Sequence, residues 1–317
     1  MKKVILDLDT GIDDALALSY ILGSPDAELI GITATYGNVV IEQGVTNNLN
    51  LLAMYHREDV PVYKGIAYPT GTTSFEPEWF VYHGKNGTGN ISIPATATRT
   101  AEEKSAVDFI IDSVREYGND LVVISTGSST TIAAALEKAP EIIGKIHLVV
   151  MGGSLTQPGN CNPFQEANMG QDPIASNKMF ATDADITMVG LDVTTQALMS
   201  RENTQALRDT GTTSGKFLAD MTDYYIGVSE NDEGAPQGVC NLHDPLAAAV
   251  ALDPTLVKTF PINLKVETEG PSIGRTIGDP SRLLSPVKNT KVALEVDTKR
   301  FTERFMERLL SLVTSID

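Results

Sequence analysis

The sequence predicts an α/β fold with a doubly wound, mostly parallel sheet and helices on both of its faces. Short runs of β-branched and aliphatic residues alternate with amphipathic stretches of helical length, which is the pattern of βαβ units. The runs are nearly continuous in Val, Ile and Leu, as expected for parallel strands covered on both faces. The sequence contains no repeat or obvious interdomain linker, so we expect residues 1–317 to form a single domain.

The predicted elements follow one another in order. Strands are expected at residues 3–8, 27–35, 121–125, 145–151 and 186–190. Helices are expected between them at residues 13–22, 42–55, 101–116, 130–138 and 172–182. A C-terminal helix is expected at residues 298–313. Its apolar stripe, which we interpret as core packing, is formed by Phe301, Phe305, Leu309 and Leu312.

Two stretches do not fit the alternating pattern. Residues 65–100 are rich in Gly, Pro, Thr and aromatic side chains, and residues 227–241 are rich in Gly, Pro and acidic side chains. Both are expected to be loops. Loops of this length are uncommon in compact domains unless they cover a site, so we interpret them as lids, with solvated surface excursions as the alternative.

Composition and charge narrow the possible partners. The net charge of −17 disfavours nucleic acid polymers and anionic membranes, because no block of Lys or Arg offsets the repulsion from phosphates. No apolar run is long enough to span a membrane, and Asp7 interrupts the only candidate signal-peptide core, so a cytoplasmic location is expected. The two cysteines, Cys161 and Cys240, are interpreted as ordinary thiols. A small neutral or cationic ligand fits this chain better.

Polar residues follow four of the predicted strands. In open α/β sheets, ligands bind outside the carboxyl ends of the strands, so these residues are expected to share one rim. They lie in the segments Asp7-Leu8-Asp9-Thr10-Gly11-Ile12-Asp13-Asp14, Tyr36-Gly37-Asn38, Ser125-Thr126-Gly127 and Met151-Gly152-Gly153.

The first segment carries four aspartates within eight residues. Such crowding is repulsive unless a cation neutralises it, which indicates a hard divalent metal between Asp9 at the strand end and Asp14 in the first helical turn. Gly11 is expected to permit the sharp bend between them. The alternative is that Asp13 and Asp14 only complement the positive end of the helix dipole.

From this segment onward the chain resembles the inosine/uridine-preferring nucleoside hydrolases, whose N-terminal fingerprint is Asp-x-Asp-Pro/Thr-Gly-x-Asp-Asp. Residues 7–14 match it, and the resemblance continues in order through nearly the whole chain. The later matching segments are Gly37-Asn38, Ser125-Thr126-Gly127, Met151-Gly152-Gly153, residues 160–168 with Glu166 inside them, Asp172-Pro173 and Leu242-His243-Asp244-Pro245-Leu246-Ala247.

The resemblance implies calcium-dependent hydrolysis of the N-glycosidic bond of ribonucleosides to base and ribose. The implied calcium ligands are Asp9, both oxygens of Asp14, Asp244 and the backbone carbonyl of Thr126, an oxygen-only set of the kind that calcium accepts. Asp9 is interpreted as the general base that deprotonates the attacking water. The purine or pyrimidine preference stays open, and a homodimer or homotetramer is expected.

The same resemblance implies how ribose is held. Asp13 and Asn168 would bind the 2′- and 3′-hydroxyls, Asn160 and Glu166 would face the 5′-hydroxyl, and Asn38 would be a further polar contact. Glu166 also has a physical role open to it, because a negative field stabilises the cationic sugar that forms as the base departs.

His243 is the side chain best suited to protonate the departing base. His83 matches a histidine that some family members place near the base, although the family pattern usually has an acidic residue where Lys85 or Asn86 stands. The sequence does not decide whether Tyr224, Tyr225 or Cys240 contacts the base.

Two other functions remain open at this point. A phosphatase of the haloacid dehalogenase type also begins with a strand ending in Asp-x-Asp, but no convincing phosphate-pairing lysine is present and Asp279 is only a weak acidic candidate. A protein that binds nucleosides or sugars without catalysis would use the same polar rim. For such a protein the unpaired carboxylate of Asp9 would be superfluous.

Overall fold

The computed structural model describes residues 1–78, 80–232 and 235–316. In this part of the chain, eight strands form the central sheet in the order β3-β2-β1-β4-β5-β6-β12-β9. All neighbours are parallel except β9, which is antiparallel to β12. The strands are β1 (Lys2–Leu8), β2 (Ala27–Ala34), β3 (Val62–Lys64), β4 (Leu121–Ser125), β5 (His147–Met151), β6 (Asp185–Val189), β9 (Val257–Ile262) and β12 (Thr290–Val296).

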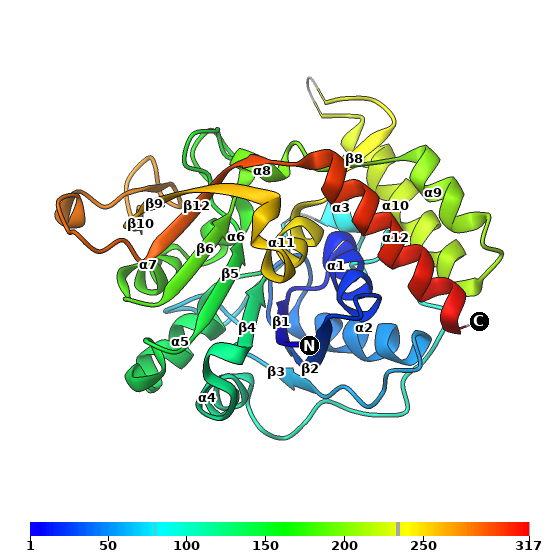
Figure 1. The fold of residues 1–317 in the computed structure, drawn as a ribbon, viewed down its shortest axis with the longest axis horizontal. Coiled ribbons are helices and arrows are strands. Elements are labelled where there is room, and N and C mark those ends of the chain that lie inside the picture. The colour runs from blue at the N-terminus through cyan, green and yellow to red at the C-terminus, as the bar shows by residue number, and fades with distance from the viewer. Residues whose placement is uncertain (79, 233–234, 317) are drawn as a thin grey trace.

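Helices cover both faces of this sheet (Figure 1). They are α1 (Ile12–Leu22), α2 (Ile41–Met54), α3 (Phe80–His83), α4 (Ala106–Tyr117), α5 (Thr130–Lys138), α6 (Ala167–Gln171), α7 (Pro173–Ala181), α8 (Leu191–Thr194), α9 (Arg201–Arg208), α10 (Thr213–Ser229), α11 (His243–Leu252) and α12 (Thr298–Ile316). Two further pairs of short strands complete the fold, β7 (Leu198–Ser200) with β8 (Val239–Asn241) and β10 (Leu264–Val266) with β11 (Thr276–Gly278).

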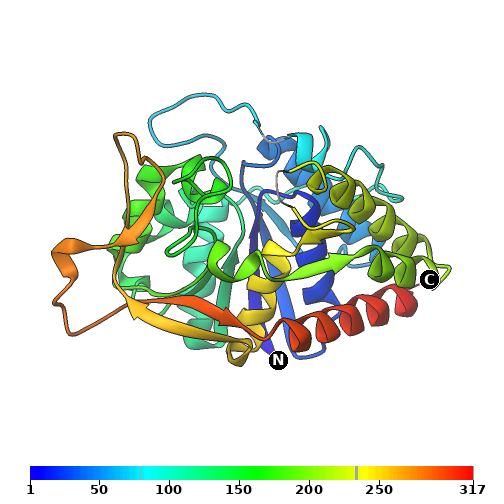
Figure 2. The ribbon, with the colours of Figure 1, turned by 90° about the horizontal axis from the view of Figure 1, so that it is seen from above.

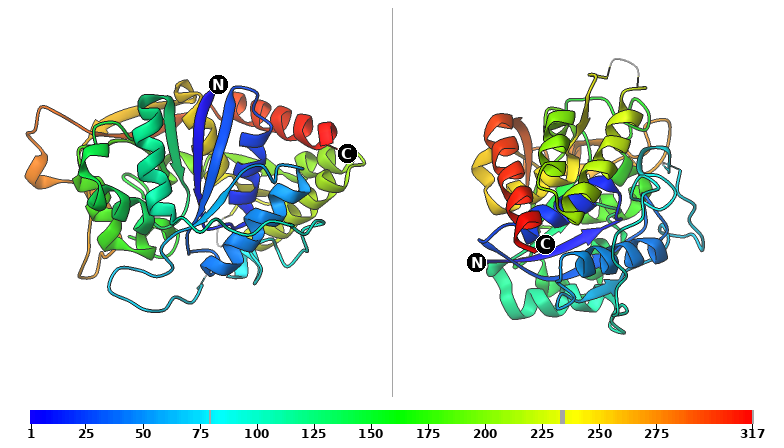
Figure 3. Two further views of the ribbon diagram at one scale, coloured as in Figure 1. Left: turned by 90° about the horizontal axis from the view of Figure 1, so that it is seen from below. Right: turned by 90° about the vertical axis from the view of Figure 1, so that its right-hand side faces the viewer.

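The alternation of side chains along β1 divides the core into two layers. Val4, Leu6 and Leu8 pack in a cluster with apolar residues of α1, α11 and α12, whereas Ile5 packs in a second cluster with residues of α4, α5 and α7. The α12 stripe lies in the first cluster, and Phe305 stacks on Tyr20 of α1 with ring centroids 6.0 Å apart. Figure 3 shows α12 running alongside α1. The prediction of a doubly wound sheet and of a core-packing stripe is therefore confirmed.

Most predicted elements differ from the observed ones by only a residue or two at each end. The helix predicted at 101–116 is an exception, since α4 begins at Ala106, where the Ser105 hydroxyl accepts a hydrogen bond from the Asp108 amide and caps the first turn. The predicted second lid is also shorter than 227–241, because α10 continues to Ser229 and β8 begins at Val239. Residue 79 of the first lid and residues 233–234 of the second lie outside the described residues.

The sheet order positions the site. Strands β3-β2-β1 continue in one direction from β1, and β4-β5-β6 continue in the other, so the connections diverge between β1 and β4. At such a switch point the loops that leave the carboxyl ends of the two strands separate and open a crevice. Asp9 follows β1 and Thr126 follows β4, which places both at this crevice.

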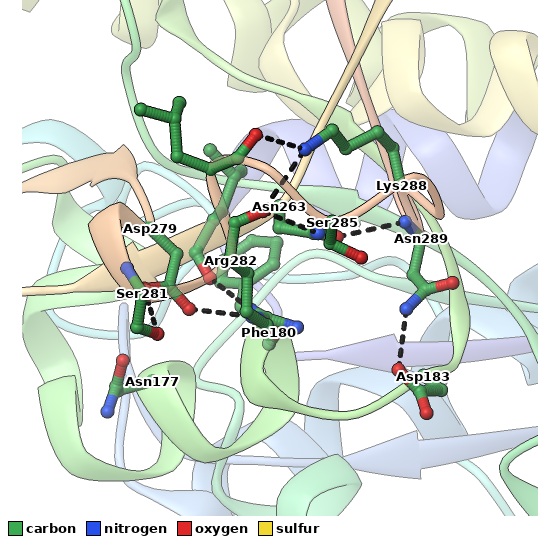
Figure 4. A network of polar contacts seen from close by, with 12 residues as sticks. Asn177, Phe180, Asp183, Asn263, Asp279, Ser281, Arg282, Ser285, Lys288 and Asn289 are labelled. Atoms are coloured by element: carbon green, nitrogen blue, oxygen red, sulfur yellow. Dashed lines mark hydrogen bonds and ion pairs between the residues drawn. The ribbon is translucent and has the colours of Figure 1, made fainter.

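Residues 263–289 form an extension that we call the arm. It contains β10, β11 and the short helix η4 (Pro280–Arg282), and it projects from the body at the left of Figures 1 and 2. Arg282 fixes its tip by donating to the carbonyls of Phe180 and Leu264, both at 2.8 Å (Figure 4). The sequence pattern did not predict the arm or the antiparallel edge strand β9, because their short strands carry little periodic signal.

Of the described helices, none is both long enough and apolar enough to cross a lipid bilayer.

Candidate active site

A cavity of about 460 Å³ opens at the carboxyl ends of β1, β4 and β5. This is an ordinary volume for a small-molecule site. Nine predicted site residues line it: Asp13, Asn38, His83, Thr126, Asn160, Glu166, Asn168, His243 and Asp244. The other two, Asp9 and Asp14, are almost fully buried immediately next to these residues. The structure thus brings together every site residue that the sequence analysis named.

Asp9 is held by one neighbour. Its Oδ2 accepts the Asn38 backbone amide at 2.8 Å and its Oδ1 accepts the Asn38 side-chain amide at 3.0 Å. A Cβ atom on Gly37 would lie only 1.9 Å from Asp9 Oδ2, so this position requires glycine. The two Asn38 donors thereby fix the Asp9 carboxyl group at the end of β1.

The turn after β1 bends at a residue that the sequence analysis did not select. Gly11 has an ordinary extended conformation with φ −86°, while Thr10 has a positive φ of 24°. A Cβ atom on Gly11 would lie 2.6 Å from both the Asn38 and His83 side chains, so Gly11 permits the turn by leaving space for them, while the unusual φ falls on Thr10. The strained residue lies between Asp9 and the helix, where backbone strain is typical of functional sites.

Three carboxylates form the acidic centre of the site. One oxygen from each of Asp13, Asp14 and Asp244 lies within 4.8 Å of the others, and all three side chains are buried. Burial raises the pKa of each, and repulsion from neighbouring carboxylates raises those of Asp13 and Asp244 further, that of Asp13 to about 7. Asp13 Oδ1 is buried without a hydrogen-bond partner. An unpaired oxygen among buried carboxylates fits a hard divalent cation, which accepts oxygen ligands only.

The other implied ligands lie around this group. The Thr126 hydroxyl donates to Asp14 Oδ1 at 2.6 Å, and the Thr126 carbonyl accepts the Asn168 side-chain amide at 2.7 Å. Asp9 lies beside Asp14 and repels it, which raises the pKa of Asp9 further above the effect of burial. Asp13, which the resemblance assigns to ribose, is itself a member of this acidic group.

Asp7, the remaining aspartate of the first segment, faces neighbouring strands. It pairs in register with Thr33 of β2 and Ser125 of β4, and both hydroxyls donate to its carboxylate at 2.6 and 3.1 Å. Burial raises its pKa to about 7. Asp7 is therefore a structural link across three strands and contributes no side chain to the cavity.

Glu166 is held by backbone amides. It accepts hydrogen bonds from Gly153, Asn168 and Met169 at 2.7 to 3.0 Å, and it caps the N-terminus of α6. These bonds favour the charged form, but the larger effect of burial raises its pKa. Asn160 lies nearby with its side-chain oxygen bound to the Ala167 amide, so its NH₂ group remains available to the cavity.

Two histidines lie in the cavity wall, and burial lowers the pKa of His83 to about 3 and of His243 to about 4. His83 Nδ1 accepts the Ile12 amide at 3.1 Å, so its proton is on Nε2 and its 3.9 Å approach to Asp13 is not an ion pair. His243 Nδ1 is 2.8 Å from the Thr194 hydroxyl, which leaves Nε2 for the cavity.

Both predicted lids contribute to the cavity wall. The first supplies Tyr82 and His83, and the second supplies Asp232, whose carboxylate accepts the Tyr82 hydroxyl at 2.7 Å and joins the two lids. Tyr225 and Cys240 line the cavity, whereas the Tyr224 hydroxyl donates to the Val81 carbonyl. Tyr82 and Asp232 were not predicted, since the only signal was the place of Tyr82 beside His83.

The charge of the wall restricts the ligand. Among the described residues, the lining includes no Lys or Arg and four carboxylates, those of Asp13, Glu166, Asp232 and Asp244. Such a wall repels phosphate groups and favours a neutral ligand rich in hydroxyls, or one that gains positive charge as it reacts.

Comparisons with known proteins agree with this chemistry. A family model described as inosine-uridine preferring nucleoside hydrolase matches residues 4–303. The enzyme of that name from Leishmania major is 33% identical over 95% of each chain. Uridine nucleosidase 1 of Arabidopsis thaliana is 34% identical over 88% of this chain and 82% of that protein.

A solved structure extends the comparison to the fold. The purine-preferring ribonucleoside hydrolase from Gardnerella vaginalis is 54% identical, with a TM-score of 0.96 over 99% of this chain and 100% of that one. Fold and site thus define an enzyme that hydrolyses the N-glycosidic bond of nucleosides. The chain belongs to the inosine-uridine preferring nucleoside hydrolase family.

Proposed function

We propose that this enzyme is a calcium-dependent ribonucleoside hydrolase that releases free base and ribose. The observation that carries the proposal is the unpaired Oδ1 of Asp13 within a group of buried carboxylates, at the wall of a cavity whose described lining residues include no Lys or Arg. The high identity to a purine-preferring enzyme supports purine ribonucleosides among the substrates, and the uridine nucleosidases support pyrimidine ribonucleosides. A phosphatase would need cations for its phosphate, which this wall does not supply.

Asp14, Asp244, Asp9 and the Thr126 carbonyl would hold the calcium ion. When bound, the ion supplies positive charge that lowers the pKa of a water molecule on it. Asp9 then takes the proton of the attacking water, because its two oxygens are acceptors fixed by Asn38 beside the acidic group. The lone pairs that Asn38 does not use remain available for that proton.

The ribose would lie between the acidic group and Glu166. Asp13 and Asn168 would bind the 2′- and 3′-hydroxyls, with Asn38 as a further contact, and Asn160 would donate its free NH₂ toward the 5′-hydroxyl. Glu166 is buried and has no lining cation beside it among the described residues, so its field stabilises positive charge that develops on the sugar.

His243 would protonate the departing base through Nε2, and His83 would contact the base. Thr194 orients His243, while burial keeps its ring neutral at pH 7 before substrate binds. As negative charge develops on the base it favours the imidazolium form, so the ring would take a proton from solvent water, pass a proton to the base through Nε2 and return to its neutral form.

Metal removal tests the proposed function. Exhaustive chelation should abolish release of ribose from inosine and uridine and should lower the thermal midpoint of unfolding, because four crowded carboxylates lose their counter-charge. Calcium should restore both. Ribose release and thermal scans measure the two effects. Full turnover by a protein shown to be metal-free by elemental analysis would contradict the proposal.

Replacement of His243 tests the acid. His243→Ala should slow inosine hydrolysis by about 10²-fold or more, the usual contribution of a positioned acid, yet barely affect a p-nitrophenyl riboside, whose phenolate departs without a proton. Steady-state kinetics at saturating calcium measure both rates. Equal losses on the two substrates would instead mean that His243 only supports the metal site beside Asp244.

We also propose that residues 1–317 act as one cytoplasmic domain that assembles as a homodimer or homotetramer. Three side chains at the tip of the arm support assembly, since Leu283, Leu284 and Val287 are 65%, 94% and 61% exposed. Measurement of the molar mass in solution would check the number of copies in the assembly.

A further inference from the structure

Residues 153–166 form a closed loop that carries much of the cavity wall. Its ends meet where the Gly153 amide donates to Glu166 at 2.7 Å, and inside it the Cys161 amide donates to the Gln165 carbonyl at 3.1 Å. Compact surface loops with joined ends are frequently functional. This one contributes Gln157, Pro158, Gly159, Asn160, Cys161 and Glu166 to the cavity.

One side of the loop is held by a buried carboxylate. Asp192 of α8 accepts the Leu155 amide at 2.9 Å and the Thr156 amide and hydroxyl, both at 2.6 Å. Asp192 is 4% exposed and is absent from the cavity lining. Asp192 lies in the helix that follows β6, and from there it holds the backbone amides of Leu155 and Thr156.

The other side is held by the arm. Arg275 directs its guanidinium to two carbonyls of the same loop, Gln157 at 2.8 Å and Leu155 at 3.1 Å, and these residues lie more than a hundred positions earlier in the chain. The backbone of Gly274 also lies against the loop, because a Cβ atom there would be 2.8 Å from Gln165. At residues 155–157, Asp192 therefore holds two backbone amides and Arg275 holds two backbone carbonyls.

We propose that Arg275 is a positioning residue for substrate recognition at the 5′ end of the ribose. Arg275 does not line the cavity, yet it holds the backbone of the turn that immediately precedes Asn160. Loss of the Arg275 hydrogen bonds to the Leu155 and Gln157 carbonyls would allow residues 155–160 to shift. A displacement of about 1 Å at a positioning group can lower the rate on the order of 10²-fold. This inference rests on the proposed contact between Asn160 and the 5′-hydroxyl.

The arm offers a matched control for this test. Like Arg275, Arg282 is partly buried and donates to two backbone carbonyls (Figure 4), but these belong to Phe180 and Leu264, which do not line the cavity. Arg275→Ala, Arg275→Lys and Arg282→Ala should be compared in the calcium-loaded enzyme. The substrates are inosine and 5′-deoxyinosine, which lacks only the hydroxyl that Asn160 is proposed to bind.

Arg275→Ala should lower kcat/KM for inosine by about 10-fold or more, mostly through KM, and for 5′-deoxyinosine by less than about 2-fold. Arg275→Lys should recover part of the loss, because an ammonium donates to one carbonyl without the fork of a guanidinium. Arg282→Ala should leave both substrates within about 2-fold. Amide hydrogen exchange of residues 155–166 should increase in Arg275→Ala only.

Equal losses on both substrates, an Arg282→Ala effect as large as that of Arg275→Ala, or unchanged exchange in residues 155–166 would overturn the positioning role. Failure of the underlying ribose placement would appear in the wild-type enzyme alone, as equal kcat/KM for inosine and 5′-deoxyinosine. That result would overturn the 5′ contact and the positioning role together, whereas failure of the positioning role alone appears only in the variants.

Discussion

Removal of the 2′-hydroxyl from the ribose should lower kcat/KM by about 10⁴-fold, since sites built to bind a hydroxyl discriminate this strongly against analogues that lack it. The proposed partner, Asp13, is buried, and its Oδ1 has no hydrogen-bond partner among the described residues. A deoxyribose would leave that oxygen without a hydrogen-bond donor in a buried pocket, and this cost would fall on the transition state.

Paired substrates measure this effect. The kcat/KM ratios of inosine to 2′-deoxyinosine and of uridine to 2′-deoxyuridine should be similar, because the discrimination resides in the sugar. Asp13→Asn should reduce these ratios by weakening the response to the hydroxyl. Comparable kcat/KM for uridine and 2′-deoxyuridine would place the ribose elsewhere in the cavity.

Asp9→Asn should lower kcat by at least about 10²-fold, the low end for loss of a general base. The amide keeps one oxygen but cannot take a proton. It also directs an NH₂ group at one of the two Asn38 donors that now bind the carboxylate. Asp9→Ala should cost more, because it removes an implied metal ligand as well. Kinetics measured at saturating calcium separate the loss of the proton acceptor from the loss of metal affinity.

Asp7→Asn is the matched control. Asp7 lies two residues earlier, inside β1, is also almost fully buried, and is bound by two hydroxyls that can rotate to suit an amide. Its loss in kcat should stay within a few-fold. Near-normal kcat in Asp9→Asn would move the base to another residue, and a large loss in Asp7→Asn would show that the strand end itself is disturbed.

The sequence was informative where neighbouring residues carry the chemistry. The aspartates after the first strand and the segment around His243 indicated the site because they are contiguous, and parallel strands bring their ends to one edge. The sequence did not predict those contacts of the site that join residues far apart in the chain. Asp192, Arg275 and the Tyr82–Asp232 contact link residues 36 to 150 positions apart, and no periodicity or local motif encodes such pairs.

Local conformation was also beyond the sequence pattern at two points. The glycine in the fingerprint indicated a bend at residue 11. In the structure, the close approach of the Asn38 and His83 side chains explains why residue 11 is glycine, and Thr10 adopts the unusual φ. The tautomer of His83 follows from a hydrogen bond to the Ile12 amide, across 71 positions. Both depend on packing that exists only after the chain has folded.

The raised pKa values of the acidic group imply an exchange of protons for the cation. Without a bound cation, burial and the crowding of neighbouring carboxylates raise the pKa values of Asp9, Asp13 and Asp244, so this group keeps protons at a higher pH than free carboxyl groups do. A divalent cation that entered the site would displace those protons into solvent. Occupancy is therefore linked to acidity, and the affinity for the ion decreases as pH falls through the range in which these carboxyl groups titrate, which for Asp13 lies near 7.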